Sequence, residues 1–71
     1  METGRKRFGH RVRELRTAAG ISQETLAEQA GIHRTYVSDL ERGGRNVGLD
    51  NIIAIARALG VTPSDLMAGV E

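Results

Sequence analysis

Cysteine and tryptophan are absent from the 71-residue sequence, and proline, tyrosine and phenylalanine each occur only once. A chain without cysteine has neither a disulfide framework nor a thiolate metal site. No apolar run approaches the roughly 18 residues that span a bilayer, and none follows the basic start METGRKRFGH to form a secretory signal. These absences predict a cytoplasmic protein with no membrane partner.

The sequence also lacks the side-chain groupings that catalysis and metal binding require. His10 and His33 are isolated from each other and from other ligands, so we expect no metal site. No nucleophile, base and orienting group stand out as a catalytic set. The length is below the usual domain size of about 100 to 150 residues. We therefore expect one domain, residues 1–71, with no enzyme activity, no cofactor and no small-molecule effector.

The formal net charge of +1 conceals an uneven distribution of charge along the chain. Residues 1–16 carry six cations and two anions, whereas residues 47–71 carry one cation and three anions. Nine of the ten cationic residues are arginine, whose planar guanidinium matches phosphates and base edges better than lysine does. The basic start, Arg5 to Arg7, is interpreted either as a solvated tail or as an arm that contacts phosphates.

Apolar residues recur at steps of three and four, and no segment alternates with the period of two that a strand requires. Glycines separate these stretches, and Ser22 and Thr62 stand where side chains cap helix N-termini. The pattern predicts an all-α fold of five compactly packed helices. The expected inner faces are Phe8, Val12, Leu15 and Ala19; Leu26, Ala27 and Ala30; Val37 and Leu40; and Leu49, Ile52, Ile53, Ala56 and Leu59, and a short fifth helix is expected through Leu66 and Met67.

Residues 23–42 predict a helix-turn-helix. Two short helices that meet at a wide angle need a small residue where their backbones approach, a glycine in the bend and apolar residues in the corner. Ala27 supplies the small residue and Gly31 follows four positions later. Ile32 flanks the corner, and a third helix over about residues 34–42 faces it with its apolar side. The joint spacing is more specific than a glycine-linked helix pair alone.

The third helix has a second face made of hydrogen-bonding side chains. At about 100° per residue, the polar residues of this helix fall opposite Val37 and Leu40. Arginine binds guanine at O6 and N7, and serine and threonine contact bases or phosphates, so this face carries the chemistry of major-groove reading. An ordinary solvated helix face is the alternative interpretation. The residues on this face are Arg34, Thr35, Ser38, Asp39 and Arg42.

The sequence resembles the phage-repressor-like (XRE or Cro-like) helix-turn-helix family of DNA-binding domains. The residues that carry the likeness are Ile21-Ser22-Gln23-Glu24-Thr25-Leu26-Ala27, Leu40-Glu41-Arg42-Gly43 and Ala58-Leu59-Gly60-Val61. A second stretch is similar to the controller proteins of restriction-modification systems, which are small homodimeric regulators of transcription. This stretch is Arg34-Thr35-Tyr36-Val37-Ser38, with Glu41-Arg42 and Arg45-Asn46 after it.

The resemblance implies two sets of DNA-contacting residues. Those that match base-reading positions are Arg34, Thr35, Tyr36 and Ser38. Those that match phosphate-binding positions are Ser22, Gln23, His33, Arg42, Arg45 and Asn46, and His33 is alternatively a weak helix cap. The N-terminus of a helix attracts an anion, which agrees with the place of Gln23.

Two structural contacts are also expected, the first of them implied by the resemblance. Arg16 and Glu41 match an internal salt bridge, and a carboxylate beside Leu40 on the inner face independently requires a partner. The C-terminal region, about residues 52–70, is expected to form a homodimer contact. The residues expected there are Ile55, Leu66, Met67 and Val70, and the alternative is that they close the core of the monomer.

The sequence thus predicts a homodimeric, sequence-specific regulator of transcription that binds double-stranded DNA at a pseudo-palindromic operator. We expect a restriction-modification controller protein of bacterial or phage type, cytoplasmic and on the nucleoid when bound. RNA polymerase is a further candidate partner, through Glu24 or Glu28 on the second helix. The alternative is an antitoxin-type protein that neutralises a partner protein and regulates its own operon.

Overall fold

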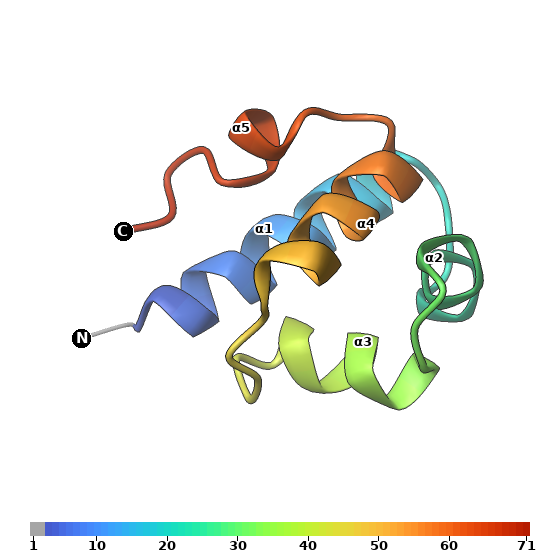
Figure 1. Cartoon of the computed structure of the whole chain (residues 1–71), viewed down its shortest axis with the longest axis horizontal. Coiled ribbons are helices and arrows are strands. Elements are labelled where there is room, and N and C mark those ends of the chain that lie inside the picture. The colour runs from blue at the N-terminus through green and yellow to red at the C-terminus, as the bar shows by residue number, and fades with distance from the viewer. Residues whose placement is uncertain (1–2) are drawn as a thin grey trace.

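Five helices make up the regular structure of residues 3–71, the part of the chain that the computed structural model describes (Figure 1). Within that part no strand forms, and none of its helices is long and apolar enough to cross a membrane. The predicted all-α fold of five helices is confirmed. The helices are α1 (Gly4–Ala18), α2 (Gln23–Ala30), α3 (Arg34–Glu41), α4 (Leu49–Leu59) and α5 (Pro63–Leu66).

Helix boundaries follow the capping residues of the sequence. The hydroxyls of Ser22 and Thr62 each accept a hydrogen bond of 3.0 Å from the backbone N–H three residues later, at the start of α2 and α5. Pro63 occupies the first position of α5, where its missing N–H is harmless. Gly31 and Gly60 end α2 and α4 with φ of 71°, a left-handed conformation that glycine adopts without strain.

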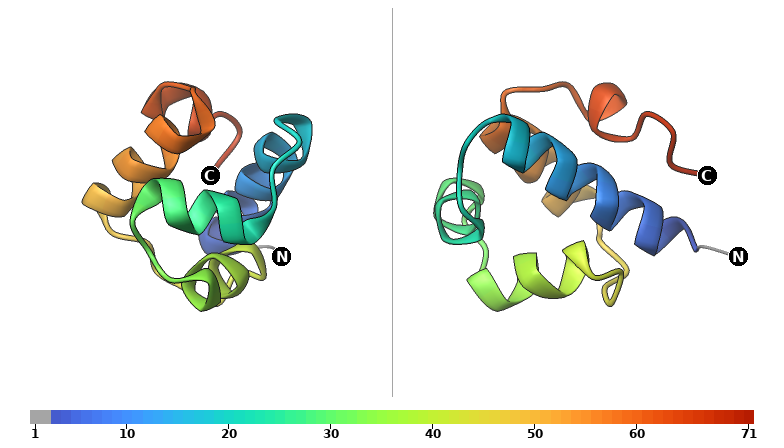
Figure 2. Two further views of the ribbon diagram at one scale, coloured as in Figure 1. Left: turned by 90° about the vertical axis from the view of Figure 1, so that its right-hand side faces the viewer. Right: turned by 180° about the vertical axis from the view of Figure 1, so that it is seen from behind.

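The core lies where α1 and α4 are covered from two sides. Helix α3 packs on α1, α2 packs on α3 and α4, and α5 packs on both α1 and α4 (Figures 1 and 2). In Figure 1, α3 and α5 therefore lie at opposite sides of the molecule. The buried apolar residues are Phe8, Val12, Leu26, Ala27, Val37, Leu40, Ile55, Ala56 and Leu66.

Two residues of the predicted inner faces are exposed instead. Leu49 is 71% exposed because it is the first residue of α4, where the helix extends past the edge of the core. Ala19 is exposed because it lies beyond the last turn of α1, at the C-cap. Both predictions were wrong, since helical periodicity gives the direction of a side chain but not where the core ends.

Gly9 brings α1 into direct contact with the backbone of α3. A Cβ atom at this position would lie 2.3 Å from the carbonyl oxygen of Leu40 and 2.8 Å from that of Glu41. Carbon and oxygen atoms that are not bonded do not approach this closely, so only glycine fits here. The contact fixes the C-terminal end of α3 against the middle of α1.

The C-terminal segment is held to α1 by one arginine. The Arg11 guanidinium donates to the backbone carbonyl of Asp65 from Nε at 3.1 Å and from Nη2 at 2.7 Å. Its Nη1 donates to Glu14 in the next turn of α1 at 2.6 Å. The same carbonyl also accepts from the backbone N–H of Ala68 at 3.2 Å, so Arg11 adds a link between the end of α5 and α1.

Candidate nucleic-acid interface

Helices α2 and α3 form a glycine-linked pair that presents α3 at the surface. After Gly31, the backbone N–H of Ile32 donates back to the carbonyl of Ala27 at 2.9 Å and closes α2. Val37 and Leu40 are fully buried and attach one side of α3 to the core. The opposite side of α3 faces away from the other helices (Figures 1 and 2).

The carboxylate of Glu41 fixes α3 from within. Its side chain is 4% exposed and receives hydrogen bonds from Arg16 Nε to Oε2 at 2.7 Å and from Arg16 Nη2 to Oε1 at 3.0 Å. Gln23 Nε2 donates to Oε1 at 3.1 Å, and Arg16 Nη1 donates to the carbonyl of Ile21 at 2.9 Å. One buried carboxylate therefore joins α1, α2 and α3, and the expected pair between Arg16 and Glu41 is present.

The protonation of Arg16 follows from this contact. The hydrogen bond to Glu41 raises the pKa of the Arg16 guanidinium above its usual value, and burial, which lowers it, has the smaller effect. The charge of Glu41 adds to the upward shift of this pKa. The guanidinium thus stays charged beside its buried partner.

Gln23 contributes to this junction in a way that the sequence did not indicate. Its side-chain amide is directed to Glu41 and half-buried, although the sequence predicts a phosphate contact at this position. Gln23 is also the first residue of α2, so its backbone N–H lies in the first turn, where helix N–H groups are unpaired. A phosphate contact at this position would therefore come from the backbone N–H.

The residues predicted to read bases lie along the outer side of α3 in two environments. Arg34 and Thr35 are exposed in its first turn. Ser38 is half-buried, and its hydroxyl accepts a hydrogen bond of 2.8 Å from Arg42 Nη1. Tyr36 is half-buried, its hydroxyl accepts from Asn51 Nδ2 at 3.2 Å, and the Arg45 guanidinium lies 5.0 Å from the centre of its ring.

Asp39 joins the two arginines that follow α3. Its Oδ1 accepts from Arg42 Nη2 at 2.5 Å and its Oδ2 accepts from Arg45 Nη2 at 3.2 Å. The helical pattern of the sequence places Asp39 on this face but indicates no function for it. The spacing of three between Asp39 and Arg42 was the available signal, because residues i and i+3 are neighbours on a helix. The approach of Arg45 depends on the path of the loop, which the sequence pattern does not give.

The remaining phosphate-binding candidates surround α3. Ser22 caps α2 through its hydroxyl. His33 is exposed at the N-cap of α3, and its side chain makes no capping hydrogen bond, so the expectation of a weak cap was wrong. Asn46 is exposed in the loop before α4. Residues 5–7 are exposed in the first turns of α1, so they are helical and not an extended tail, and their contact with phosphates stays a prediction.

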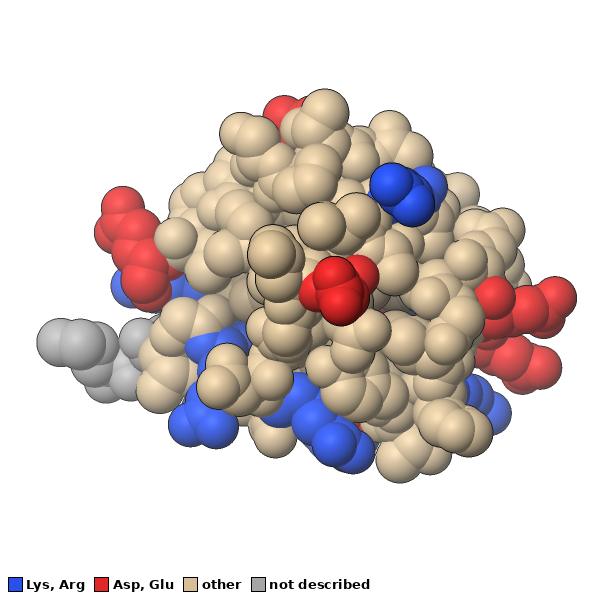
Figure 3. All heavy atoms as spheres, viewed as in Figure 1, with Lys and Arg blue, Asp and Glu red and all other residues tan. Residues whose placement is uncertain are grey.

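Charged side chains are distributed unevenly over the surface. Figure 3 shows lysine and arginine side chains gathered along the lower edge of the molecule, the side that α3 occupies in the same view. The surface toward α4 and α5 is mostly uncharged. Among the residues that the structure describes, no group of three or more acidic or histidine side chains is placed to hold a metal ion. The arrangement is therefore suited to a polyanion that contacts α3.

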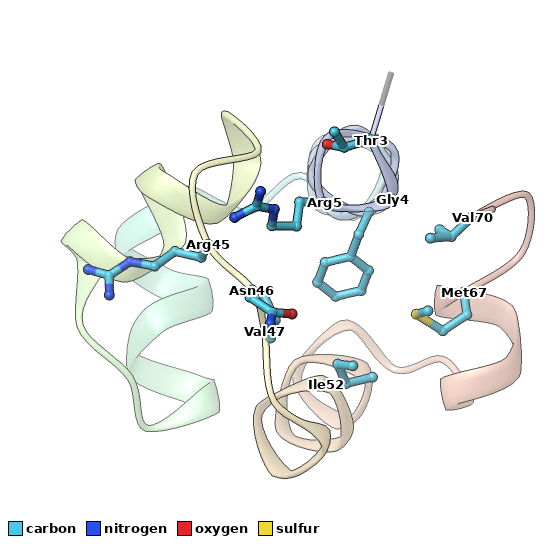
Figure 4. Close-up of a pocket in the computed structure, with 10 residues that line it drawn as sticks. Thr3, Gly4, Arg5, Arg45, Asn46, Val47, Ile52, Met67 and Val70 are labelled. Carbon is cyan, nitrogen blue, oxygen red and sulfur yellow. The ribbon is translucent and has the colours of Figure 1, made fainter. Parts of the chain in front are cut away.

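A mostly apolar pocket of about 360 Å³ opens beside this surface, and Arg45 and Asn46 are among the residues that line it (Figure 4). Ile52 of α4 and Met67 and Val70 of the C-terminal segment face it, while Arg45 points away from it. Met67 is 37% exposed, and the 71% exposed Leu49 lies three residues before Ile52 on α4. The described surface thus combines an apolar hollow with exposed apolar side chains close to it.

Two residues expected at a dimer contact belong to the core instead. Ile55 and Leu66 are both 0% exposed. Helix α4 is covered by α2 and by α5, so its buried arc is wide enough to include Ile55, and Leu66 is directed inward as α5 crosses it. The alternative interpretation, in which they close the core of the monomer, is correct for these two residues. Met67 and Val70 remain at the surface.

The buried and exposed sides of α3, its glycine-linked partner α2 and the basic surface around them define a helix-turn-helix DNA-binding domain. Comparison with known proteins agrees, because residues 12–66 match the family described as Helix-turn-helix. The chain belongs to the phage-repressor-like helix-turn-helix family of DNA-binding transcription regulators, and these regulators are not enzymes.

Individual proteins show which members of this family the chain resembles. Control protein C.BamHI of Bacillus amyloliquefaciens is 56% identical over 61 residues, which are 84% of this chain and 75% of that protein. The crystal structure of the restriction-modification controller protein C.AhdI from Aeromonas hydrophila matches with a TM-score of 0.86 and 55% identity, over 87% of this chain and 94% of that chain. The DNA-binding domain of the P22 C2 repressor matches with a TM-score of 0.83 and 28% identity, over 90% of this chain and 86% of that chain.

Proposed function

We propose that this chain is the controller protein of a restriction-modification system and binds a pseudo-palindromic operator as a homodimer. The observation that carries the proposal is the outer side of α3, which offers Arg34 and Thr35 while Val37 and Leu40 anchor its inner side. The similarity to control protein C.BamHI and to the restriction-modification controller protein C.AhdI supports the subtype. The single domain, residues 1–71, carries out both DNA binding and self-association.

Base recognition is assigned to the first half of α3. Arg34 and Thr35 enter the major groove and contact base edges, because the N-terminal residues of a recognition helix reach deepest there. Tyr36 and Ser38 lie closer to the sugar-phosphate backbone or the central base step. Phosphates are held from both sides of the groove by the backbone and side chains of Ser22, Gln23, His33, Arg42, Arg45 and Asn46.

The size of the molecule supports binding as a pair. The chain measures 31 × 23 × 22 Å, whereas one turn of B-DNA is about 34 to 36 Å long. A single copy therefore covers one major-groove segment, and two recognition helices in successive grooves require two copies. A two-fold pair presents the same residues to both half-sites, so the operator repeats its sequence in inverted order.

The contact between copies is assigned to the apolar surface around the pocket. Ile52, Met67 and Val70 line the pocket, and the exposed Leu49 lies one helical turn before Ile52 on α4. In the proposed pair, Leu49 of one copy faces the hollow of the other. A two-fold contact needs a surface that complements itself, and a protruding leucine beside an apolar hollow meets this requirement. Burial of these side chains adds stability to a domain whose own core is small.

The contact with RNA polymerase is assigned to the acidic side of α2. Glu24 and Glu28 are exposed and one helical turn apart. A dimer bound just upstream of a promoter presents these carboxylates to the polymerase, whereas a dimer over the promoter blocks it. Charge reversal at both positions abolishes activation in a reporter assay and leaves operator binding intact; unchanged activation overturns the assignment.

Selection of duplexes from a random library by the purified protein tests the proposed function. The expected result is an inverted repeat whose half-site centres lie about 10 base pairs apart, since each half-site occupies one turn of DNA. Size-exclusion chromatography of the protein with the selected duplex gives two chains per duplex. Failure to enrich any sequence, with a stable complex formed only with a partner protein, favours the antitoxin alternative and overturns the proposal.

A further inference from the structure

Asp39 holds both arginines that follow the recognition helix. Its two carboxylate oxygens bind Arg42 and Arg45 separately, and Arg42 also donates to Ser38. Arg45 lies over the ring of Tyr36, whose hydroxyl receives the amide of Asn51. The two side chains assigned to phosphates therefore occupy one defined arrangement, which α3, the following loop and α4 build together.

The arrangement leaves both arginines able to bind phosphates. The side chains of Arg42 and Arg45 are 69% and 46% exposed, against 28% for Asp39. A guanidinium carries five N–H donors. Arg42 uses two of them in these contacts and Arg45 uses one, so a phosphate can be bound while the ion pairs persist. Ion pairs this exposed are weak, so a phosphate in another position can also pull an arginine away.

We propose that Asp39 is a specificity-determining residue, which positions Arg42 and Arg45 for the phosphates of the operator and weakens their use on other DNA. This inference rests on the proposed function. On the operator, Arg34 and Thr35 set the depth and register of α3, and the phosphates meet the two arginines where Asp39 holds them. On random DNA the register is not fixed, and the arginines must leave Asp39 to reach a phosphate.

A role in specificity explains why the acidic Asp39 lies on the outer side of α3. Binding to random DNA comes almost entirely from contacts between cations and phosphates, whereas base contacts add only to specific binding. A carboxylate that occupies two cations therefore lowers affinity for random DNA more than affinity for the operator. The ratio of the two affinities, which decides where a regulator binds in a genome, increases.

The test compares Asp39→Asn with the wild type on two duplexes, one selected from a random library by the wild type and one of random sequence. The substitution keeps the size of the side chain and removes its charge. The expected result is binding to the random duplex that is about three- to fivefold tighter, with binding to the selected duplex unchanged or weaker. The salt slope on the random duplex becomes steeper by about 0.9 for each phosphate gained.

Asp65→Asn is the matched control. It makes the same change in net charge on α5, which lies on the other side of the molecule from α3 (Figure 1). The control leaves the ratio of selected to random binding unchanged. If Asp39→Asn also leaves the ratio unchanged, or if both variants change it equally, the proposal is overturned.

A variant that lacks both arginines distinguishes positioning of these arginines by Asp39 from direct repulsion between Asp39 and phosphate. In a chain that carries Arg42→Gln and Arg45→Gln, Asp39→Asn has no effect on random-duplex binding if the carboxylate acts through the arginines. An effect that persists there shows direct repulsion between carboxylate and phosphate, and overturns the proposal. If selection enriches no duplex, the proposed function fails together with this inference; an enriched duplex with an unchanged ratio defeats this inference alone.

Discussion

The Arg16 guanidinium donates to both carboxylate oxygens of Glu41, at 2.7 and 3.0 Å, between α1 and the last residue of α3. The two side chains are 13% and 4% exposed, so water screens little of this contact. A buried pair of this kind is costly to break, because the remaining charge is left without a partner. The orientation of α3 therefore depends on a largely buried side chain of α1.

Arg16→Ala is expected to lower the free energy of unfolding by about 3 kcal/mol, because Glu41 is left buried with only the hydrogen bond from Gln23. Urea unfolding followed by circular dichroism measures the change. Arg13→Ala, an exposed position on the same helix, is the control and shifts stability by less than about 0.5 kcal/mol. Unchanged stability with lost DNA binding would instead place Arg16 at the DNA.

Gly9→Ala is expected to destabilise the fold by about 2 kcal/mol or more. The new methyl group meets two backbone carbonyls of α3, which cannot move without shifting the helix. Gly4→Ala, in the same helix, places its methyl group 3.7 Å from its nearest neighbour and changes stability by less than about 0.5 kcal/mol. Equal unfolding midpoints for the two variants contradict the close approach of α1 and α3.

Arg34→Ala is expected to weaken binding to a selected duplex by about 1 to 3 kcal/mol and to relax preference at one base pair, because a bidentate base contact is lost. Competition with duplexes altered at single positions locates that base pair. Arg45→Ala instead weakens binding without changing the preference at any base pair, and it reduces the salt slope by about 1. An equal loss on selected and random DNA for Arg34→Ala identifies it as a phosphate ligand only.

Leu49→Glu is expected to shift the protein from dimer to monomer, because it places a carboxylate in an apolar contact. The fold is retained, since Leu49 is 71% exposed in the single chain. Sedimentation equilibrium measures the association, and circular dichroism verifies the helix content. Arg57→Gln changes the net charge equally at an exposed site on the same helix and leaves the association intact. A dimer unaffected by Leu49→Glu removes this surface from the contact.

Local chemistry made the helices predictable from the sequence. Ser22 and Thr62 offered hydroxyls to the first turns, and Gly31 and Gly60 stopped helices by adopting a conformation that other residues avoid. These choices are made within a few residues, so periodicity and capping rules capture them. A carboxylate on an inner face indicated that Glu41 needs a partner, and the resemblance to the family identified Arg16 as that partner.

Features that depend on the path of the chain were not predictable in the same way. Ile55 was expected outside because the sequence does not state that α5 folds over α4 and widens its buried arc. The side chain of Gln23 was assigned to phosphate. Its contact with Glu41 was not predicted, because the distance between the two residues depends on the angle between α2 and α3. The contact of Arg45 with Asp39 needs the loop that follows α3 to turn back, which no pattern of residue types specifies.

The attachment of α3 through Gly9 and Glu41 limits how the domain can adapt to a DNA duplex. Backbone carbonyls of α3 touch α1, and the carboxylate at its end joins three helices, so α3 can tilt only if the whole domain rearranges. The domain then presents α3 to DNA in one orientation. Imperfect matches must be accommodated by bending or twisting of the duplex, and easily deformed base steps gain an advantage even where no side chain touches them.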